Sequence, residues 1–524
     1  MTLKHFSNWK DPAICLSLAN LWLLRIWSQS LTYSRSDSYL MQSPPPPALY
    51  FAAVLNVLCL GALFWVLLQA SRLIRNRKIL RLCQMAFLVS LLVPMNAFRE
   101  VLGRYFPYLK GNLIRVVGES GAATIVIAIA ILLFIVFALW SSPIIALVRI
   151  MLLILFAFFP VTLGQALWRA AKTDGAAYAA GPSAEVLRTA EPAPIRVLWI
   201  IFDELDQRLV YDERPADLKL PEFDALRQRS LFASKAYPPT GGATLVAMPS
   251  MITGKPVRKG IQIGPDELQL LFSDASERAS WKREQSVFGK ARALGFNTAL
   301  VGWYHPYCRI LSSDLTRCFW REMPMIHNSM GSRISELMPN QIRSLFETSL
   351  LSPFGQSLTT IHAIRNHQEM VDEALSIAGD PSIGLALFHF QIPHSPHGYN
   401  RHTGRFELAN SPVSGYLDSL ALADRTLGSV LETVKKQGLS WKTLLLISSD
   451  HSYRSAWALG EKPDRRVPFL LSLPGQTRGL EFREPFNTIL THDLLLALLH
   501  REVSSEDDAR EWLAKMAQTF EVRP

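Results

Sequence analysis

The apolar residues of this chain are concentrated before residue 170. Five runs there are long enough to cross a bilayer, which takes roughly 17 to 25 mainly apolar residues. They lie at residues 12–32, 48–70, 79–98, 122–140 and 143–168. Because more long runs follow the first, we interpret it as a span and not as a cleaved signal peptide. The pattern predicts a polytopic, α-helical membrane anchor of about five spans over residues 1–168.

Charged residues set the expected orientation of this anchor. The segment SRLIRNRK between the second and third runs is strongly basic, and Lys4 and Lys10 precede the first run. Basic loops stay on the cytoplasmic side, so five crossings leave the C-terminal part outside the cytoplasm. Arg25 lies inside the first run, where a charge costs roughly 2.5 to 3.5 kcal/mol on insertion scales. We expect Arg25 to find a compensating partner or to reach the interface.

A different pattern follows the last apolar run. Residues 169–194 are rich in Ala, Gly and Pro without a helical or strand period, which is typical of a linker. Short β-branched runs then alternate with amphipathic segments; the runs are RVLWIIF, NTALVGW, GLALFHF, TLLLISS and VPFLLSL. This alternation predicts an α/β domain with a mostly parallel sheet and helices on both faces, over residues 195–524.

Composition agrees with a membrane protein. Of 524 residues only 19% are charged and 49% are hydrophobic, whereas soluble domains carry about 25% charged residues. The formal net charge is +10. Because the basic residues border the apolar runs, we attribute this charge to topology and lipid headgroups, and we expect no nucleic-acid partner.

Candidate chemistry lies where the predicted strands end, since ligands of open α/β sheets bind at the carboxyl ends of strands. The first run ends in Asp203 and Glu204, the fourth ends in Asp450 and His451, and the third continues into the histidine-rich segment PHSPH. Carboxylates and imidazoles gathered in this way suit a divalent metal, with Zn or Mn most expected.

The candidate nucleophile lies in the charge-free stretch AYPPTGGATLVAMPSMITG, which leads into a predicted helix. Its hydroxyl residues Thr240, Thr244 and Ser250 are the candidates. The amides at the N-terminus of the predicted helix would hold an anionic group. A Thr hydroxyl is a weak nucleophile unless a metal lowers its pKa, which agrees with the predicted metal site. Taken alone, the stretch also fits a glycine turn with a capping Thr.

The order of these motifs resembles the alkaline phosphatase superfamily in its sulfatase-like branch. With membrane spans in front, the chain is similar to the phosphoethanolamine transferases of the bacterial envelope and to the lipoteichoic acid synthases. The resemblance covers about residues 195–475. In those transferases the nucleophilic Thr stands five residues before a Pro, and Thr244 with Pro249 reproduces this spacing. The resemblance therefore favours Thr244 over Thr240.

Site residues follow from the same resemblance. It implies that a metal is held by Asp203, Thr244, Asp450 and His451. It also implies that Thr244 is the nucleophile and that His394 is a substrate or second-metal residue. Because His394 lies at a different strand end, it is free to protonate the departing hydroxyl or activate the incoming one, and we assign Thr244 and His394 as the catalytic residues.

The sequence departs from the family in three places. Arg465 and Arg466 stand before VPFLLSLPG, where the transferases have a further His, and we expect guanidinium contacts to an anion there. We accordingly assign substrate binding to Arg466 and to His397 of the PHSPH segment. The pair Asp203 and Glu204 is closer to the paired acids of sulfatases than to the single Glu of the transferases.

The third departure concerns formylglycine. Sulfatases that use it need Cys or Ser two residues before the Pro of a C-x-P-S-R motif. Ala247 occupies that position here, and Met251 stands where the Arg should be. The sequence excludes a formylglycine mechanism.

The five cysteines divide by their location. Cys15, Cys59 and Cys83 lie in membrane runs, where they are interpreted as small apolar residues. Cys308 and Cys318 lie in the exported domain, where an oxidising compartment favours their pairing. We predict a disulfide between them.

Three functions remain open at this stage. The leading hypothesis is a metal-dependent transferase in the bacterial inner membrane, with its catalytic domain on the periplasmic or extracellular side. It moves a phospho-substituent of the phosphoethanolamine or phosphoglycerol type from a membrane lipid donor to an envelope glycan or lipid, through a covalent Thr intermediate. The alternative is a membrane-anchored sulfatase-like hydrolase of phosphate or sulfate esters. A catalytically inactive scaffold is disfavoured, because the strand-end acid, the Thr segment, the histidine-rich segment and the Asp-His pair are all present.

Overall fold

The computed structural model describes residues 9–105, 124, 128, 140, 142–172, 175–187, 193–239, 242–273, 278–347, 357–407, 412–454, 464–520 and 522. The chain forms two compact units. The first, which we call the helical unit, comprises Met1–Tyr33, Pro45–Asp174 and Met325–Leu358. The second, the sheet unit, comprises Ser34–Pro44, Gly175–Pro324 and Thr359–Pro524. Each unit thus includes one segment from the part of the sequence that mainly builds the other.

The helical unit contains two long apolar helices and several shorter ones. It is built from α1 (Lys10–Trp22), α2 (Leu24–Ser30), α4 (Pro47–Arg72), α5 (Arg77–Ser90), α6 (Leu92–Tyr105), the helix Ser142–Leu155, α8 (Phe158–Ala171) and α13 (Ile334–Ser344). Pro47 is the first residue of α4, where its fixed φ suits a helix start and its missing N–H is not needed.

Two helical stretches, Pro47–Arg72 and Arg77–Val101, are long and apolar enough to cross a membrane. Ser142–Leu155 and Phe158–Ala171, bent by 40°, make a third if they count as one span. The first predicted run is divided between α1 and α2 at Leu23, and the run at 122–140 lies almost wholly outside the described residues. The described part of the chain therefore supports a membrane anchor with two to three apolar helical spans.

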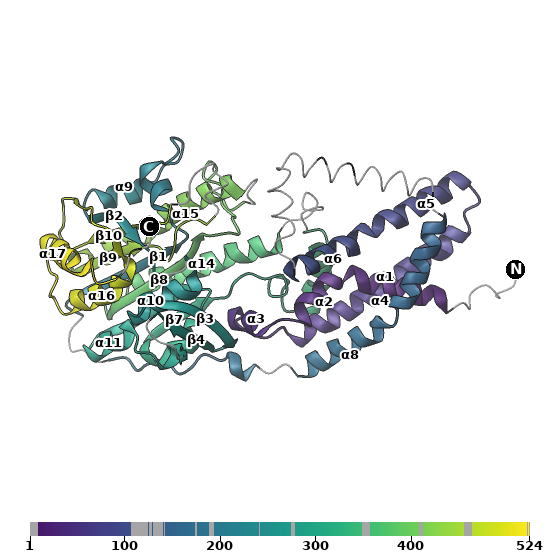
Figure 1. Cartoon of the computed structure of the whole chain (residues 1–524), viewed down its shortest axis with the longest axis horizontal. Helices are drawn as coiled ribbons and strands as arrows, with labels where there is room; N and C mark the ends of the chain where they lie inside the picture. The colour runs from purple at the N-terminus through teal and green to yellow at the C-terminus, as the bar shows by residue number, and fades with distance from the viewer. Residues whose placement is uncertain are drawn as a thin grey trace. The chain divides into compact units, whose positions relative to one another are not determined.

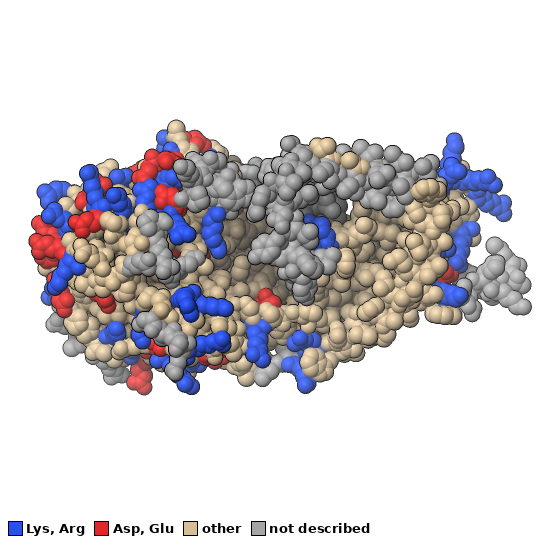
Figure 2. Space-filling model, viewed as in Figure 1, with Lys and Arg blue, Asp and Glu red and all other residues tan. Residues whose placement is uncertain are grey.

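The surface of the helical unit agrees with a lipid environment. Figure 2 shows mostly uncharged surface over its described helices, with Lys and Arg gathered where α4 gives way to α5. On α4, Val66 and Leu67 expose 54% and 57% of their surface. Large apolar side chains facing outward over several turns are expected where lipid is the solvent.

Arg25 has the compensating partner that the first apolar run required. Its Nε lies 2.8 Å from Glu100 Oε2, and its Nη1 donates to the carbonyl of Ser344 at 2.5 Å. Glu100 belongs to α6, which continues beyond the third predicted run at residues 79–98.

The sheet unit is built on a twisted sheet whose path runs in the order β11, β2, β10, β9, β1, β8, β6, β7, with β12 paired to β2. Its strands are β1 (Arg196–Asp203), β2 (Leu231–Tyr237), β6 (Asn297–Trp303), β7 (Arg317–Arg321), β8 (Ile383–Pro393), β9 (Thr443–Ser448), β10 (Val467–Ser472), β11 (Leu480–Phe482) and β12 (Phe486–Asn487). The five apolar runs of the sequence are β1, β6, β8, β9 and β10, so the prediction of a mostly parallel α/β sheet is confirmed. Strand β10 is antiparallel to both neighbours.

Helices cover both faces of this sheet (Figure 1). They are α9 (Pro221–Arg227), α10 (Thr244–Thr253), α11 (Val287–Ala293), α12 (Tyr307–Ile310), α14 (Leu358–Ala378), α15 (Pro412–Lys436), α16 (Thr491–Leu499) and α17 (Glu506–Met516); α3 (Arg35–Leu40) and a small sheet of β3 (Val257–Gly264), β4 (Glu267–Phe272) and β5 (Arg278–Ser280) complete the unit.

Strand β1 lies at the centre and is buried along its whole length. Leu198, Ile200 and Phe202 share one face and join the core cluster that contains α14 and α15 residues. The alternate residues face the opposite layer, where α16 contacts β1. Burial on both faces explains why the strand is a continuous apolar run and not an alternating one.

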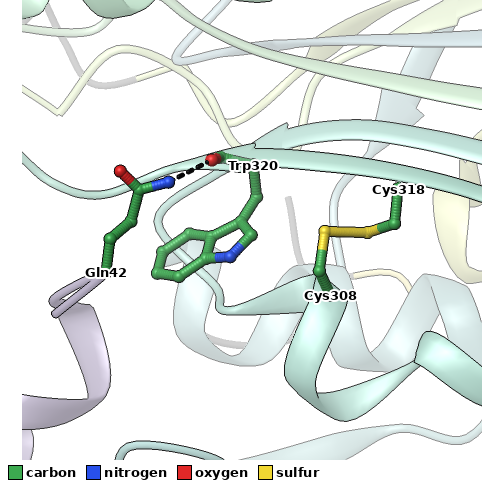
Figure 3. The surroundings of a disulfide bond; sticks show 4 residues. All are labelled: Gln42, Cys308, Cys318 and Trp320. Atoms are coloured by element: carbon green, nitrogen blue, oxygen red, sulfur yellow. Dashed lines mark hydrogen bonds between the residues drawn. A yellow bond between two sulfur atoms is a disulfide. The ribbon is translucent and has the colours of Figure 1, made fainter. Parts of the chain in front are cut away.

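The predicted disulfide is confirmed. Cys308 of α12 and Cys318 of β7 are joined (Figure 3). The bond ties the connection after β6 to the strand that follows it.

Candidate metal and nucleophile site

Four side chains meet at the carboxyl ends of β1 and β9, beside the N-terminus of α10. Ligand atoms of Asp203, Asp450 and His451 all lie within 4.8 Å of one another. Thr244 Oγ1 lies 2.7 Å from Asp450 Oδ2, 3.2 Å from Asp203 Oδ2 and 3.5 Å from His451 Nε2. The structure thus brings together all four residues that the family resemblance assigned to the metal.

A serine holds the two strand ends in register. Ser449 Oγ donates to the carbonyl of Phe202 at 2.7 Å and accepts from the amide of Leu205 at 2.9 Å. Asp450, the next residue, accepts the amide of Glu204 on Oδ1 at 3.3 Å. Glu204 has φ +67°, a conformation that non-glycine residues rarely adopt and that is common at functional sites. The chain therefore turns sharply after Asp203, which keeps the Asp203 carboxylate at the strand end.

Thr244 is the first residue of α10, as the sequence predicted for a nucleophile at a helix start. Gly242 before it has φ +56°, which glycine adopts without steric cost. The other two candidates differ. Ser250 donates to the carbonyl of Val246 at 2.7 Å inside the helix, and Thr240 lies outside the described residues.

Burial and like charges make the acid pair electrostatically unusual. Asp203 and Asp450 are fully buried and His451 is 1% exposed. Burial, together with the charges of Asp450 and Glu204, raises the pKa of Asp203 well above its ordinary value. Burial would also raise the pKa of Asp450, but His451, His389 and the Thr244 hydrogen bond hold that pKa below its usual range. Two acids in contact with one imidazole are poorly compensated unless a cation or proton joins them.

The donor set fits a divalent metal. Asp203 Oδ1 is buried and accepts no hydrogen bond from the described residues, so one carboxylate oxygen is left to bind an ion. Two carboxylates, one imidazole and a hydroxyl oxygen are ligands that Zn and Mn both accept. Asp203, Thr244, Asp450 and His451 are the residues that would hold the ion.

His394 and Arg454 border this cluster. His394 Nε2 lies 2.9 Å from Arg454 Nη2, which can only donate, and His394 Nδ1 lies 2.5 Å from the carbonyl of Ser395. The ring is therefore neutral, with the proton on Nδ1 and the lone pair on Nε2. Burial lowers its pKa, which favours the same state. Arg454 Nε in turn donates to Glu204 Oε1 at 2.7 Å.

The two residues assigned to substrate binding, His397 and Arg466, have protein partners of their own. His397 Nδ1 lies 3.2 Å from Ser419 Oγ of α15, and burial lowers its pKa to about 4. Arg466 forms ion pairs with Asp464 at 2.6 Å and with Asp212 at 2.9 Å. The guanidinium of Arg466 is thus already neutralised by two carboxylates. Arg454 is instead the arginine that contacts His394.

The sequence reading missed three residues of this region: Arg454, Tyr304 and His305. Tyr304 and His305 directly follow β6, so the strand-end rule that found Asp203 and Asp450 would have found them too. Tyr304 has φ +68°, and burial with the nearby charges of Asp203 and Asp450 raises its pKa to about 12. No sequence signal marked Arg454, because it stands in a loop four residues after Asp450.

The family comparison agrees with this site. Residues 196–507 match the sulfatase family model. No curated protein matches the chain. Solved structures of three bacterial proteins are among those that resemble the chain. An alkaline phosphatase superfamily protein from Vibrio parahaemolyticus is 13% identical over 61% of this chain and 68% of that chain, with a TM-score of 0.38.

The other two solved structures are of proteins whose names state an enzymatic activity. The lipoteichoic acid synthase LtaP from Listeria monocytogenes is 12% identical over 61% of this chain and 76% of that chain, with a TM-score of 0.39. The phosphonate monoester hydrolase of Agrobacterium radiobacter is 15% identical over 58% of this chain and 74% of that chain, with a TM-score of 0.39.

The buried cluster of Asp203, Asp450 and His451 lies at the carboxyl ends of a mostly parallel sheet with the Thr244 hydroxyl beside it, and this site fits an enzyme of the sulfatase family. The family match covers more than half of the sequence, and the chain belongs to the sulfatase family. Ala247 and Met251 on α10 keep it apart from the members that use formylglycine.

Proposed function

We propose that this protein is a membrane-anchored, metal-dependent transferase that carries a phospho-substituent on Thr244. The observation that supports this best is the contact of Thr244 Oγ1 with both buried carboxylates, at 2.7 and 3.2 Å. A threonine used only as a helix cap would bond to backbone amides of its own helix. Here the hydroxyl faces the acid cluster, where a nucleophile is needed.

The reaction has two displacements. In the first, Thr244 Oγ1 loses its proton to the carboxylates that already accept its hydrogen bond, and it attacks the phosphorus of a lipid phosphodiester. The bond from phosphorus to the lipid oxygen breaks, and the lipid alcohol leaves with the proton that the carboxylates took from Thr244. In the second, an acceptor hydroxyl gives its proton to His394 and attacks phosphorus. The bond from phosphorus to Thr244 Oγ1 breaks, and the proton held by His394 returns to Thr244. A divalent metal bound by the cluster would stabilise the Thr alkoxide and the phosphoryl charge.

His394 and Arg454 supply the remaining chemistry. The Nε2 lone pair of His394 can take the proton of the incoming hydroxyl, since the hydrogen bond of Nδ1 to Ser395 keeps the ring neutral. Arg454 is about half exposed and can turn from His394 to a non-bridging phosphoryl oxygen. Its Glu204 contact keeps the guanidinium near the site in either position.

The membrane location supports a lipid donor. A catalytic unit attached to apolar helices meets a lipid substrate laterally, and a phosphoethanolamine or phosphoglycerol headgroup fits a site built for a phosphodiester. The proposed acceptor is an envelope glycan or lipid. With water as the acceptor the same residues would make a hydrolase of phosphate or sulfate esters, and membership of the sulfatase family keeps this second candidate open.

Two measurements test the proposal. Incubation of the purified full-length protein with bacterial phospholipid, without acceptor, is expected to add the mass of the transferred group to the peptide containing Thr244. Mass spectrometry of envelope lipids and glycans from cells with and without the protein would identify that group. An unmodified Thr244 peptide together with an unchanged envelope would contradict the transferase.

The location is tested separately. We propose five crossings, with the N-terminus inside a bacterial inner membrane and the sheet unit on the periplasmic or extracellular side. A reporter fused after Pro524 should then be active only outside the cytoplasm, and one inserted near Arg75 only inside. The opposite result at Pro524 would deny the site an extracytoplasmic substrate.

A further inference from the structure

We propose that Tyr39 and His305 are positioning residues for Thr244, and that the segment Ser34–Pro44 is therefore a functional part of the catalytic site. This segment stands between α2 and α4 in the sequence but belongs to the sheet unit. The inference rests on the proposed function only for its activity readout. Its structural readouts are independent of any substrate.

The segment Ser34–Pro44 is held by specific contacts within the sheet unit. Its helix α3 begins with a capping box between Ser34 and Asp37. After α3, the guanidinium of Arg309 donates to the carbonyls of Met41 and Gln42, each at 2.7 Å. Four hydrogen bonds in such a short stretch, including the capping box, fix the backbone on both sides of Tyr39.

Gln42 adds further contacts to this segment. Its side chain donates to the carbonyl of Trp320 at 2.6 Å (Figure 3). Its backbone amide donates to Glu322 Oε2 at 2.7 Å. Figure 3 also shows the disulfide beside this contact, between Cys308 and Cys318. The disulfide joins α12, which carries Arg309, to β7, which carries Trp320. The two elements that hold the segment Ser34–Pro44 are thus cross-linked to each other.

Tyr39 connects the segment Ser34–Pro44 to the backbone of Thr244 through His305. The side chain is fully buried, and its hydroxyl lies 2.7 Å from His305 Nδ1. His305 is also fully buried, and its Nε2 lies 3.0 Å from the carbonyl of Thr244. A carbonyl only accepts, so Nε2 carries the proton and Nδ1 accepts from Tyr39. The contacts select one neutral tautomer and leave both ring nitrogens satisfied.

The carbonyl of Thr244 lies in the first turn of α10, where extra support matters. Pro249 lacks an N–H, so the carbonyl of Leu245 has no donor four residues later in the helix. The first turn therefore has fewer internal hydrogen bonds than usual. The His305 bond holds the peptide group of Thr244 while its hydroxyl faces Asp203 and Asp450. A misplacement of about 1 Å at a nucleophile can cost about a hundredfold in rate.

The aromatic surroundings keep His305 in place. Its ring packs against Trp281 with centroids 4.9 Å apart and against Tyr307 at 5.5 Å. Both neighbours are fully buried. The ring therefore has no room to reorient when its hydrogen bonds are intact. The Thr244 carbonyl decides that Nε2 carries the proton, and the Tyr39 hydroxyl satisfies Nδ1.

The test uses the full-length protein with Tyr39→Phe, which removes one hydroxyl and keeps the ring. We expect kcat to fall about tenfold, the value of one buried hydrogen bond, with KM and metal content unchanged. Amide hydrogen exchange in the peptide covering α10 should become faster. The ¹⁵N signal of His305 Nδ1 should shift because it loses its donor, whereas Nε2 should keep its proton.

Tyr50→Phe is the matched control. Tyr50 is 2% exposed, and its hydroxyl donates to the carbonyl of Ser30 at 3.1 Å within the helical unit. This variant also loses a buried tyrosine hydroxyl, but it should leave exchange in α10 and turnover unchanged. Equal exchange in α10 for both variants and the wild type would overturn the positioning role.

Replacements of His305 give a second test. Gln can donate to the Thr244 carbonyl and accept from Tyr39, whereas Leu can do neither. His305→Gln should therefore retain more turnover and slower α10 exchange than His305→Leu. Equal behaviour of the two variants in both measurements would contradict the inference. If the wild type turns over no ester, the proposed function fails, and hydrogen exchange still decides the positioning role.

Discussion

Each unit of this protein buries charge, and the two do so in opposite ways. In the helical unit, Arg25 and Glu100 form a pair of opposite sign at 2.8 Å, with side-chain exposures of 12% and 26%. In the sheet unit, Asp203 and Asp450 are two acids of the same sign and fully buried. Among the described residues, His451 is the one basic side chain at ion-pair distance from either acid.

The difference separates a structural charge from a functional one. A pair of opposite charges satisfies itself and needs nothing from outside the chain. Two buried acids raise the free energy of the folded state unless a cation or a proton joins them, and such arrangements are concentrated at functional sites. The acid pair thus indicates a ligand, whereas the Arg25 pair accounts only for a charge within an apolar run.

The largest effect is expected from breaking the acid pair. Asp450→Asn should abolish turnover and metal binding, because it removes a ligand charge and the partner of the Thr244 hydroxyl. Thr244→Ala should abolish turnover as well but keep the metal, since Asp203, Asp450 and His451 remain. Metal analysis of the purified variants distinguishes the two. Near-normal activity of Thr244→Ala would show that the nucleophile is a different residue, with Thr240 the next candidate.

A smaller loss is expected beside the acid pair. His394→Ala should slow turnover about 100-fold or more without loss of metal, because proton transfer typically contributes about 100-fold to 10,000-fold. Steady-state rates and metal content of the variant measure this. Metal loss in His394→Ala would instead make His394 a ligand.

The opposite-charge pair in the helical unit can be broken in one or two steps. Glu100→Gln should lower stability by removing the carboxylate that pairs with the Arg25 guanidinium, and the Arg25→Gln/Glu100→Gln double variant should recover part of that loss. Contacting charges typically show coupling of about 0.5 to 3 kcal/mol. Thermal unfolding in detergent of the wild type, both single variants and the double variant gives the coupling. Strictly additive effects of the two substitutions would mean that the ion pair contributes nothing to the free energy of unfolding.

The smallest effect concerns His367, a buried histidine that has no charged partner among the described residues. Burial lowers the pKa of His367 to about 4, below the ordinary value of 6.5. Between these two pH values the unfolded chain binds a proton that the folded chain does not, so stability falls as the pH decreases. The loss for such a histidine is about 1.4 kcal/mol for each pH unit. His367→Gln should therefore show a smaller drop in unfolding temperature from pH 7 to pH 5 than the wild type.

Several features of this protein could be predicted from the sequence, because they depend on neighbours in the chain or on general rules of a fold. Continuous apolar runs predicted five of the strands, β1, β6, β8, β9 and β10, since burial on both faces leaves no alternation. The carboxyl ends of parallel strands share one edge, so Asp203, Asp450 and His451 were expected together. The spacing of Thr244 and Pro249, known from the family, distinguished Thr244 from other hydroxyl residues.

Other features depended on residues far apart in the chain. Tyr39 and His305 are separated by 266 positions and meet only because the segment Ser34–Pro44 packs into the sheet unit. Asn56 of α4 donates to the carbonyl of Met338 at 3.0 Å, which places α13 in the helical unit although the sequence around it builds the sheet. The sequence alone led us to expect that Arg466 contacts an anion. In the folded chain its guanidinium forms an ion pair with Asp212.

The sequence therefore determined the kind of site, and the tertiary structure decided how that site is supported. Residue types and local periodicity are present in the unfolded chain and can be read one segment at a time. A hydrogen bond between distant segments, such as that of Tyr39 with His305, exists only after the backbone has been fixed by all of its other contacts. Its partners are selected by packing, and packing leaves no periodic trace in the sequence.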